Sequence, residues 1–267
     1  TVNISTNTES DYINAITSND GLFFSYNTGS NLNIEYMNGN TCSPSSINSQ
    51  TAISQFVNAN LVATIGETIL TNLTIDSGVS RELKQFDSSG NLLKNFGPIK
   101  DSMLWKENVT SSNNRLYFPF YDSDTGIEPY STNTTGDGGL FLDVEKDSTD
   151  NAFNEYGNNT RDMIEIDNSR TLTLTKSETG SALWITDGTS DGTTKLKNFQ
   201  NARHVGDMMA ARITSGVVFI ASNEQYGREI WFTDGTSSGT TLLKDIVSGP
   251  ISSNPSSLMR TENYVYF

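Results

Sequence analysis

Two short segments of this sequence carry the residue types that could do chemistry, a tryptophan followed closely by an Asp-Gly-Thr triplet. The residues that define the segments are Trp184, Asp187, Gly188, Trp231, Asp234 and Gly235. Carboxylate oxygens are ligands that Ca²⁺ prefers, so the two aspartates are weak calcium candidates. In a tight turn the same aspartate accepts backbone hydrogen bonds and the glycine supplies positive φ. We therefore predict structural turns and no cofactor, with calcium as the alternative.

An exposed tryptophan can stack on the face of a sugar, which gives Trp184 and Trp231 a second interpretation. A tryptophan that recurs at one position of a repeat more often packs between neighbouring structural units. We expect packing, and a rim of exposed aromatic side chains would favour carbohydrate binding instead.

The remaining candidates for catalysis are sparse. His204 is the only histidine and lies three residues before Asp207, but no nucleophile elbow accompanies it. Carboxylates that could pair for glycoside hydrolysis occur at Asp122 and Asp124 and at Asp143, Glu145 and Asp147. These acids fall in polar segments and are interpreted as solvated surface groups. The sequence predicts no catalytic residue.

The cysteine and asparagine residues limit which disulfides, zinc sites and glycosylation sites the chain can have. Cys42 is the only cysteine, which excludes an internal disulfide and a cysteine-based zinc site. Five Asn-X-Ser/Thr sequons are glycosylation candidates in a secreted chain: Asn3, Asn72, Asn108, Asn133 and Asn158.

Charge and hydropathy limit the partners. The net charge of -14 disfavours nucleic acid and anionic lipid, and no apolar run approaches the ~18 residues of a membrane span. Aromatic residues reach 10%, which argues against disorder. The segment that begins at Thr1 carries no signal-peptide pattern and is interpreted as the start of a processed or excised chain. We expect an extracellular or cell-surface location.

The elements that position these residues follow from a repeat. Once the two clear copies fix the register, weaker copies appear upstream, with turn positions at Asn38, Asp87, Asn133, Asp187 and Asp234. These positions are 49, 46, 54 and 47 residues apart. Each unit contains short stretches of β-branched and aromatic residues separated by Gly, Asn and Asp, the pattern of antiparallel strands. Helix signals are scarce.

A repeat of this length with four strands predicts an all-β chain, a single β-propeller domain over residues 1–267. The approximate repeats are 15–60, 61–110, 111–166, 167–212 and 213–258, with partial units at both ends, the last at 259–267. Within the last full unit, Ser257–Arg260 is expected as a short fourth strand that pairs back across the next turn. The alternatives are a linear β array and, for the ends, either pairing of residues 1–20 with the final strand or a piece of a longer repeat protein.

The two clear copies resemble the ELWxxDGT repeat family. Glu229-Ile230-Trp231 with Asp234-Gly235-Thr236 matches the family pattern, and Gly239-Thr240, Asp245-Ile246 and Pro255 follow in the family's order. Upstream, Tyr36, Lys84 and Tyr130 replace the tryptophan. The resemblance implies a propeller-like fold in a secreted or cell-surface protein and supplies no active site.

These observations lead to a functional prediction: a non-enzymatic extracellular structural or adhesive surface protein, and within that class a filament or matrix subunit joined by strand addition at its ends. The alternatives are a carbohydrate-binding, lectin-like propeller and a propeller glycoside hydrolase or lyase. Protein partners or self-assembly are expected, carbohydrate is a further candidate ligand, and neither nucleic acid nor membrane insertion is expected.

Overall fold

The computed structural model describes residues 14–28, 31–40, 44–51, 59–75, 80–99, 109–144, 163–177, 180–200, 209–262 and 264–267. These residues form strands and turns and contain no helix, so the all-β prediction is confirmed. The described residues thus contain no helix that is long and apolar enough to cross a bilayer. The chain divides into two compact units, Thr1–Leu116 with Thr132–Gly139 and Tyr117–Ser131 with Leu140–Phe267.

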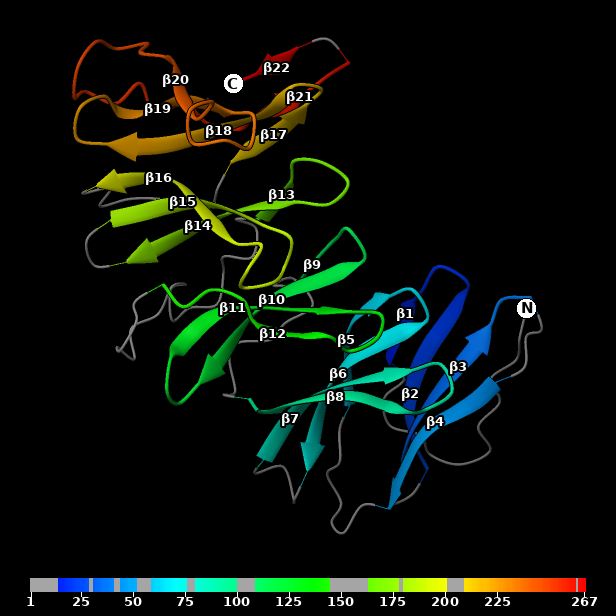
Figure 1. The fold of residues 1–267 in the computed structure, drawn as a ribbon. Helices are drawn as coiled ribbons and strands as arrows, with labels where there is room; N and C mark the ends of the chain where they lie inside the picture. The colour runs from blue at the N-terminus through cyan, green and yellow to red at the C-terminus, as the bar shows by residue number, and fades with distance from the viewer. Residues whose placement is uncertain are drawn as a thin grey trace. The chain divides into compact units, whose positions relative to one another are not determined.

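The described strands form five four-stranded sheets and one two-stranded sheet (Figure 1). The first sheet consists of β1 (Asn14–Thr17), β2 (Gly21–Thr28), β3 (Asn31–Asn38) and β4 (Pro44–Thr51). The second consists of β5 (Ala59–Ile65), β6 (Thr68–Ile75), β7 (Ser80–Asp87) and β8 (Leu92–Pro98). The third consists of β9 (Thr110–Ser112), β10 (Arg115–Asp122), β11 (Gly126–Asn133) and β12 (Gly138–Leu140).

The fourth sheet consists of β13 (Met163–Glu165), β14 (Thr171–Ser177), β15 (Gly180–Thr186) and β16 (Thr194–Gln200). The fifth consists of β17 (Ala210–Ile213), β18 (Gly216–Asn223), β19 (Gly227–Thr233) and β20 (Thr241–Lys244). A hairpin of β21 (Met259–Arg260) and β22 (Val265–Tyr266) follows. In every four-stranded sheet the strands lie side by side in chain order, as connections by short turns dictate.

The short strand near residue 259 differs in one respect from the sequence-based expectation. Met259–Arg260 does pair back across the next turn, with Met259 opposite Tyr266 and Arg260 opposite Val265. It does not join the fifth sheet, whose four strands are β17 to β20. The hairpin therefore has the position in the repeat that β17 and β18 have in the fifth sheet.

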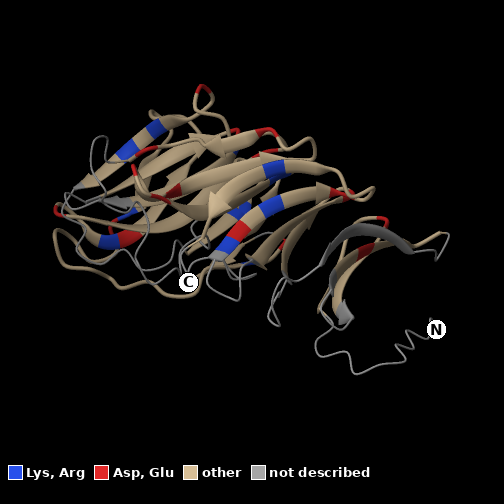
Figure 2. Cartoon of the chain, turned by 90° about the horizontal axis from the view of Figure 1, so that it is seen from below, with Lys and Arg blue, Asp and Glu red and all other residues tan. Residues whose placement is uncertain are grey.

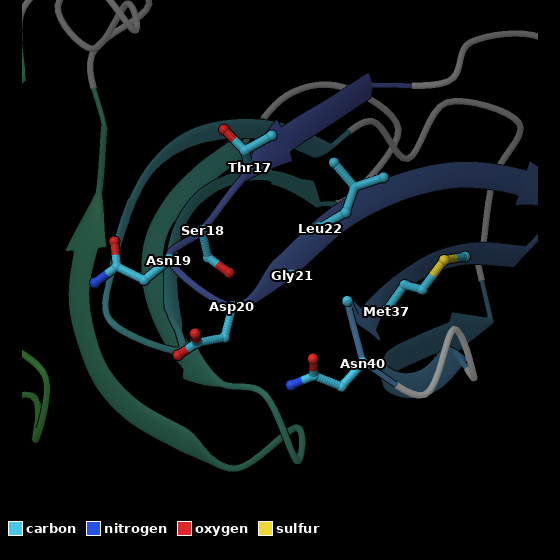
Figure 3. A pocket seen from close by; sticks show the side chains of 9 residues that line it. Thr17, Ser18, Asn19, Asp20, Gly21, Leu22, Met37 and Asn40 are labelled. Atoms are coloured by element: carbon cyan, nitrogen blue, oxygen red, sulfur yellow. The ribbon is translucent and has the colours of Figure 1, made fainter. Parts of the chain in front are cut away.

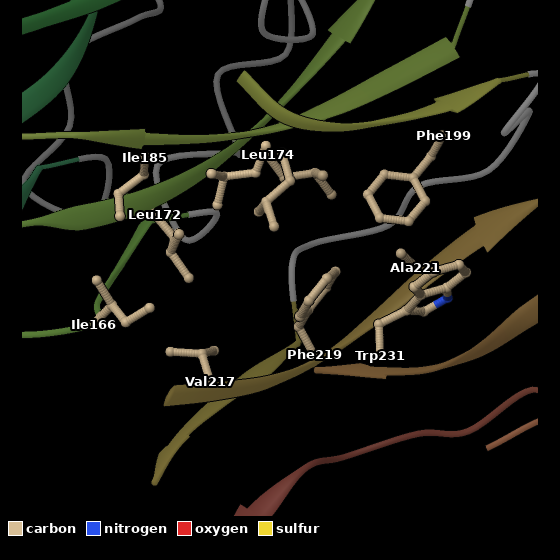
Figure 4. Close-up of a cluster of buried hydrophobic side chains, with 11 residues drawn as sticks. Ile166, Leu172, Leu174, Ile185, Phe199, Val217, Phe219, Ala221 and Trp231 are labelled. Atoms are coloured by element: carbon tan, nitrogen blue, oxygen red, sulfur yellow. The ribbon is translucent and has the colours of Figure 1, made fainter. Parts of the chain in front are cut away.

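Apolar side chains cover both faces of the sheets, because strands alternate their side chains between faces. In the second unit, Leu172, Leu174 and Ile185 of the fourth sheet pack against Val217 and Phe219 of the fifth (Figure 4). In the first unit, Phe23, Ile34 and Tyr36 of the first sheet pack against Ile69, Leu73 and Phe86 of the second. The same arrangement thus recurs: one sheet presents an apolar face to the next sheet in the chain.

Each sheet consequently has a preceding face, which packs against the sheet before it, and a following face, which packs against what comes next. In the fifth sheet Val217, Phe219 and Trp231 lie on the preceding face. Val218, Ile220 and Ile230 lie on the following face, where Leu258 of the succeeding segment covers them. These two terms are used below for every sheet.

Charge is distributed unevenly over the strands and turns. Acidic residues colour many of the turns, whereas Lys and Arg form bands along strands (Figure 2). Lys195 and Lys197 of β16 are examples, and their ammonium groups lie over the rings of Trp184 and Trp231 at 4.7 Å and 5.2 Å from the centroids. The basic side chains therefore contribute to packing within the second unit.

Candidate functional site

The two Asp-Gly-Thr segments form matching turns. Oδ1 of Asp187 accepts hydrogen bonds from the backbone N–H and the hydroxyl of Thr189 at 2.8 and 2.7 Å. Oδ1 of Asp234 accepts the same pair from Thr236 at 2.8 and 2.7 Å. Gly188 and Gly235 have φ of 87° and 88°, which a residue with a Cβ rarely adopts. The glycine thus permits the turn that the aspartate closes.

The equivalent turns of the other sheets use the same device. A side-chain oxygen of the turn residue accepts the N–H of the second residue after it in every case, at 2.9 Å for Asn38, Asp87 and Asn133. Hydrogen bonds from Thr236 lower the pKa of Asp234. Burial opposes ionisation of Asp87, but hydrogen bonds from Asn91 and nearby backbone amides outweigh it and lower the pKa of that carboxyl. These carboxylates are held ionised by the turn itself.

Among the described residues no group of three or more His, Cys, Asp or Glu side chains is arranged to hold a metal ion. A Cβ added to Gly192 or Gly239 would overlap the carboxylate of Asp187 or Asp234, so each carboxylate lies directly against its own turn. Asp187 and Asp234 therefore have a structural role in their turns, and calcium binding at either stays a prediction.

The two tryptophans have different surroundings. Trp231 is 2% exposed and meets Phe199 edge to face, with ring centroids 5.1 Å apart. Trp184 is partly exposed, and its Nε1 donates to Oγ1 of Thr175 at 2.8 Å. Neither ring lies among the residues of the described pockets. Packing, rather than a sugar-stacking rim, accounts for both.

The acidic candidates for glycoside hydrolysis are separated or committed to turns. Oδ1 of Asp122 accepts the backbone N–H of Asp124 at 2.8 Å, in the turn between β10 and β11. Burial, with the negative charges of Asp122 and Glu128, raises the pKa of the neighbouring Tyr130 to about 12. Tyr130 is therefore protonated at neutral pH and is no proton acceptor. Glu145 and Asp147 lie outside the described residues, and Asp143 follows β12.

Several further predictions fall at or outside the limits of the described chain. Cys42, His204, Asp207, Asn3, Asn108 and Asn158 lie outside the described residues. Asn72 lies within β6 and is 5% exposed, a position that a glycan cannot occupy in the folded chain. Asn133 accepts three turn hydrogen bonds through Oδ1, from Thr135 and Asp137, which leaves its amide nitrogen for a glycan.

A pocket of about 500 Å³ opens beside the β1–β2 turn (Figure 3). Asp20 is the only acidic side chain that lines it, together with polar neighbours such as Asn19 and Asn40. The backbone carbonyl of Asp20 accepts the N–H of Gly39 at 2.8 Å, which ties the turn to the end of β3. One carboxylate without a second acid or a histidine among the lining residues supports no general acid–base pair.

The most unusual feature of the described surface is its apolar end. Nine large hydrophobic side chains are exposed in the described residues, and all except Leu92 lie between residues 243 and 267. We call these eight the terminal apolar surface: Leu243, Ile246, Val247, Ile251, Met259, Tyr264, Tyr266 and Phe267. A contiguous group of exposed apolar side chains marks a surface that another segment or another protein covers.

The β21–β22 hairpin contributes the aromatic part of this surface. Met259 and Tyr266 are cross-strand partners and point to the same face, where the rings of Tyr264 and Tyr266 lie 6.1 Å apart. Ala211 and Val218 form the equivalent pair of the fifth sheet, 48 residues earlier. Val218 is 6% exposed, whereas Tyr266 is 54% exposed. The following face is thus buried in the fifth sheet and open in the hairpin.

A buried glutamate anchors the link that leads from β20 to this surface. Glu229 of β19 has no exposure, and its carboxylate accepts the N–H of Ser253 at 2.9 Å and the hydroxyl of Ser253 at 2.7 Å. The N–H of Ile246 lies 3.3 Å from Glu229 Oε2. Arg228 donates to the carbonyl of Pro255 at 2.8 Å. The sequence showed this glutamate only as part of the repeat, and its buried position was not foreseen.

A shallow pocket of about 370 Å³ adjoins the hairpin. Ile213 and the β17–β18 turn form one side, and Arg260, Glu262 and Tyr264 form the other. The pocket combines one basic and one acidic side chain with an aromatic ring. It extends the terminal apolar surface toward polar groups that could orient a bound chain.

Comparison with known proteins gives no sequence-level assignment. No family model matches the chain, and no curated protein matches it. Solved structures do match at low identity. The uncharacterized protein lmo1340 from Listeria monocytogenes is 12% identical over 85% of this chain and 64% of its own, with a TM-score of 0.40. A putative TolB from Agrobacterium tumefaciens is 12% identical over 91% of this chain and 84% of its own, with a TM-score of 0.35.

Dipeptidyl peptidase 4 from Porphyromonas gingivalis is 9% identical over 83% of this chain and only 32% of its own, with a TM-score of 0.43. The chain spans less than two thirds of the length of lmo1340 and about a third of the peptidase. At these identities and TM-scores no activity is transferred from the matched proteins to this chain.

The matched solved structures nevertheless correct the predicted function. The named matches are TolB proteins, dipeptidyl peptidase 4, a prolyl endopeptidase and puromycin hydrolase rather than adhesive, matrix or filament proteins. The prediction of a structural or adhesive surface protein is therefore wrong. The lectin-like and glycoside hydrolase alternatives gain no support from Trp231, which is buried, or from Asp122, which accepts a hydrogen bond within a turn.

Proposed function

We propose that the chain is a β-propeller that acts as a non-enzymatic protein-binding domain, with the terminal apolar surface as its binding site. Two kinds of observation support the propeller. Successive sheets pack through apolar faces in each unit. The first strands of successive sheets are also bonded to each other, by Thr64 Oγ1 to the carbonyl of Thr17 at 2.8 Å and by Arg212 to Glu165 at 3.3 Å. Blades arranged around an axis bring their first strands together in this way.

The single observation that carries the binding function is the concentration of exposed apolar side chains between Leu243 and Phe267. Aromatic residues and methionine are enriched at the centres of protein interfaces, and this surface contains two tyrosines, a phenylalanine and a methionine. Asp87, Asp187 and Asp234 each accept hydrogen bonds within their own turns, which gives these carboxylates a structural task. The ELWxxDGT resemblance and the extracellular or cell-surface location stay predictions.

Site-specific photo-crosslinking tests the binding site. We expect a photoreactive phenylalanine analogue at Tyr266 to give a discrete adduct with another protein in the cells that produce the chain. The matched control places the analogue at Leu92, which is 52% exposed against 54% for Tyr266 but lies outside the terminal apolar surface. Equal adducts from both positions, or none from Tyr266, would contradict the proposal.

The absence of catalysis is tested separately. Because the matched structures include peptidases, a panel of fluorogenic dipeptide and prolyl substrates is the relevant probe. We expect turnover no greater than that of the heat-denatured chain. Turnover that follows the chain through two unrelated purification columns would contradict the non-enzymatic part of the proposal and leave the binding site untouched.

A further inference from the structure

We propose that Asn38 is a site of self-modification: its side-chain amide is lost as ammonia after attack by the backbone nitrogen of Gly39, and an aspartate or an isoaspartate takes its place. Asn38-Gly39 is the only Asn-Gly pair in the 267 residues. Glycine leaves the attacking nitrogen unhindered because it carries no Cβ. The site lies in the turn between β3 and β4 and is independent of the terminal apolar surface.

The reaction has two steps and consumes only water. The Gly39 nitrogen loses its proton and attacks Cγ of Asn38, which closes a five-membered succinimide ring, and the Cγ–Nδ2 bond breaks so that Nδ2 leaves as ammonia. Water then opens one of the two imide C–N bonds. Opening at Cγ gives an aspartate on an ordinary backbone, and opening at the main-chain carbonyl carbon gives an isoaspartate whose backbone passes through Cγ.

The turn favours attack on the side chain of Asn38. Oδ1 of Asn38 accepts the backbone N–H of Asn40 at 2.9 Å, which closes a ring that contains the Gly39 nitrogen. Negative charge develops on Oδ1 when Cγ is attacked, and a donor already aimed at that oxygen stabilises it. Gly39 and Asn40 are exposed and line the pocket beside Asp20, so water reaches the site (Figure 3).

One hydrogen bond opposes the reaction. The N–H of Gly39 donates to the backbone carbonyl of Asp20, in the β1–β2 turn, at 2.8 Å. The Gly39 nitrogen keeps its proton and its position while this bond is formed, so the bond must open before Cγ can be attacked. Local openings of a turn cost less free energy than unfolding of the whole chain. The rate of modification therefore reports how often the β1–β2 turn separates from the end of β3.

Asn133 provides a contrast within the same fold. It has the same position in the third sheet, and its Oδ1 accepts the N–H of Thr135 at 2.9 Å, as Oδ1 of Asn38 accepts that of Asn40. The residue that follows Asn133 is Thr134, whose branched side chain crowds the attacking nitrogen. The two turns share this hydrogen bond and differ at the nucleophile, so Asn38 should react and Asn133 should not.

The other repeat turns indicate which product the fold accepts. Asp187 and Asp234 are each followed by glycine and accept the N–H two residues on at 2.8 Å. An aspartate at position 38 would accept the N–H of Asn40 in the same way and would add a negative charge near Asp20. An isoaspartate would lengthen the backbone before Gly39 and displace its N–H from the Asp20 carbonyl. The first product thus preserves the turn, and the second separates it from the β1–β2 turn.

Peptide mapping by mass spectrometry tests the proposal on the whole chain, incubated for several days at mildly alkaline pH. We expect a mass gain of about 1 Da in the peptide that contains Asn38, a matching release of ammonia, and no change in the peptide that contains Asn133. An isoaspartyl methyltransferase should label the first peptide and not the second. Intact Asn38, or equal modification of Asn133, would overturn the proposal.

Exchange of the residue after each asparagine gives matched variants. Gly39→Thr should slow the reaction at Asn38 at least about tenfold, and Thr134→Gly should make Asn133 reactive. Thr134→Gly decides the case if Gly39→Thr, whose Cβ would lie 3.1 Å from the carbonyl oxygen of Asp20, does not fold. An unreactive Asn133 in Thr134→Gly, or an unchanged rate in folded Gly39→Thr, would show that the glycine does not direct the reaction.

Comparison of the folded and the denatured chain tests the hydrogen bond from Gly39 to Asp20. We expect Asn38 to react at least about fivefold more slowly in the folded chain than in concentrated urea. Ser18→Pro removes the N–H that Ser18 donates to the carbonyl of Gly21 at 2.9 Å, and it should bring the rate in the folded chain closer to the denatured rate. A folded rate equal to or above the denatured rate would overturn the restraint assigned to the β1–β2 turn.

Discussion

The fifth sheet and the hairpin that follows it present equivalent residues of the repeat. These residues are buried in the sheet and exposed in the hairpin. Phe219 and Val218 lie on opposite faces of β18 and are both buried, by the fourth sheet on one side and by the segment around Leu258 on the other. Phe267 and Tyr266 have the equivalent positions in the hairpin, and both are more than half exposed. The repeat fixes the character of these side chains, and the neighbouring sheet decides whether they are core or surface.

The difference shows how one repeat serves stability and recognition. An apolar side chain that meets the next sheet contributes to folding through the area it removes from water. The same side chain without that sheet retains the area for a following segment or a partner. This comparison is wrong if equivalent substitutions in the fifth sheet and in the hairpin change the free energy of unfolding by the same amount.

The largest expected effect is at Phe219. Phe219→Ala should lower the free energy of unfolding by about 3–5 kcal/mol, because the side chain is wholly buried and its removal leaves a cavity beside Phe199. Phe267→Ala should change it by less than about 0.5 kcal/mol. Urea denaturation of both variants checks the pair, and a similar loss for both would mean that the hairpin is packed in the isolated chain.

A smaller effect is expected at Glu229. Glu229→Ala removes the acceptor for the N–H and hydroxyl of Ser253 and should cost about 2–3 kcal/mol, since those donors lose their partner. Hydrogen exchange of residues 246–253 should accelerate in this variant before any other segment. Glu262→Ala, at an exposed position of the hairpin turn, is the control and should be neutral. Unchanged exchange of the link would show that Glu229 does not anchor it.

The smallest expected effect is on the stability of the fold at acidic pH. Burial opposes ionisation of Asp167, but hydrogen bonds from Arg170 and Ser169 outweigh it and hold the pKa of Asp167 at about 2. Because the folded pKa lies below the unfolded value of about 3.9, this stabilisation is complete above pH 4 and is lost as the pH falls toward 2. Solvent screening keeps it below about 1 kcal/mol.

Asp167→Asn should therefore flatten the loss of stability between pH 4 and pH 2 and leave the affinity of the terminal apolar surface for its partner unchanged. Denaturation midpoints measured across this range check the first part, and the yield of the photo-adduct at Tyr266 at neutral pH checks the second. A steeper acid dependence in the variant would refute the assigned role of Asp167.

Much of the fold could be predicted because the repeat turns have a fixed chemistry. Asn38, Asp87, Asn133, Asp187 and Asp234 were found by spacing, and each accepts the N–H two residues on. An Asx turn is local, so its residue types suffice to locate it. The strands on either side then follow from the two-residue period.

The candidate site could not be predicted in the same way. Tyr266 and Val218 both read as apolar strand residues, and nothing local distinguishes the one that a neighbouring segment covers. The burial of Glu229 was missed for a similar reason, because the acceptor role depends on a link whose path brings Ser253 back to β19. Exposure depends on contacts between distant segments, whereas a turn depends on adjacent residues.

The most direct test of the binding surface is hydroxyl-radical footprinting of Met259, Tyr264 and Tyr266, read by mass spectrometry, in the isolated chain and in the cells that produce it. We predict ready modification of all three in the isolated chain, strong protection in cells, and equal modification of Leu92 in both. Equal modification of the three residues in both conditions would contradict the claim that a partner covers the terminal apolar surface.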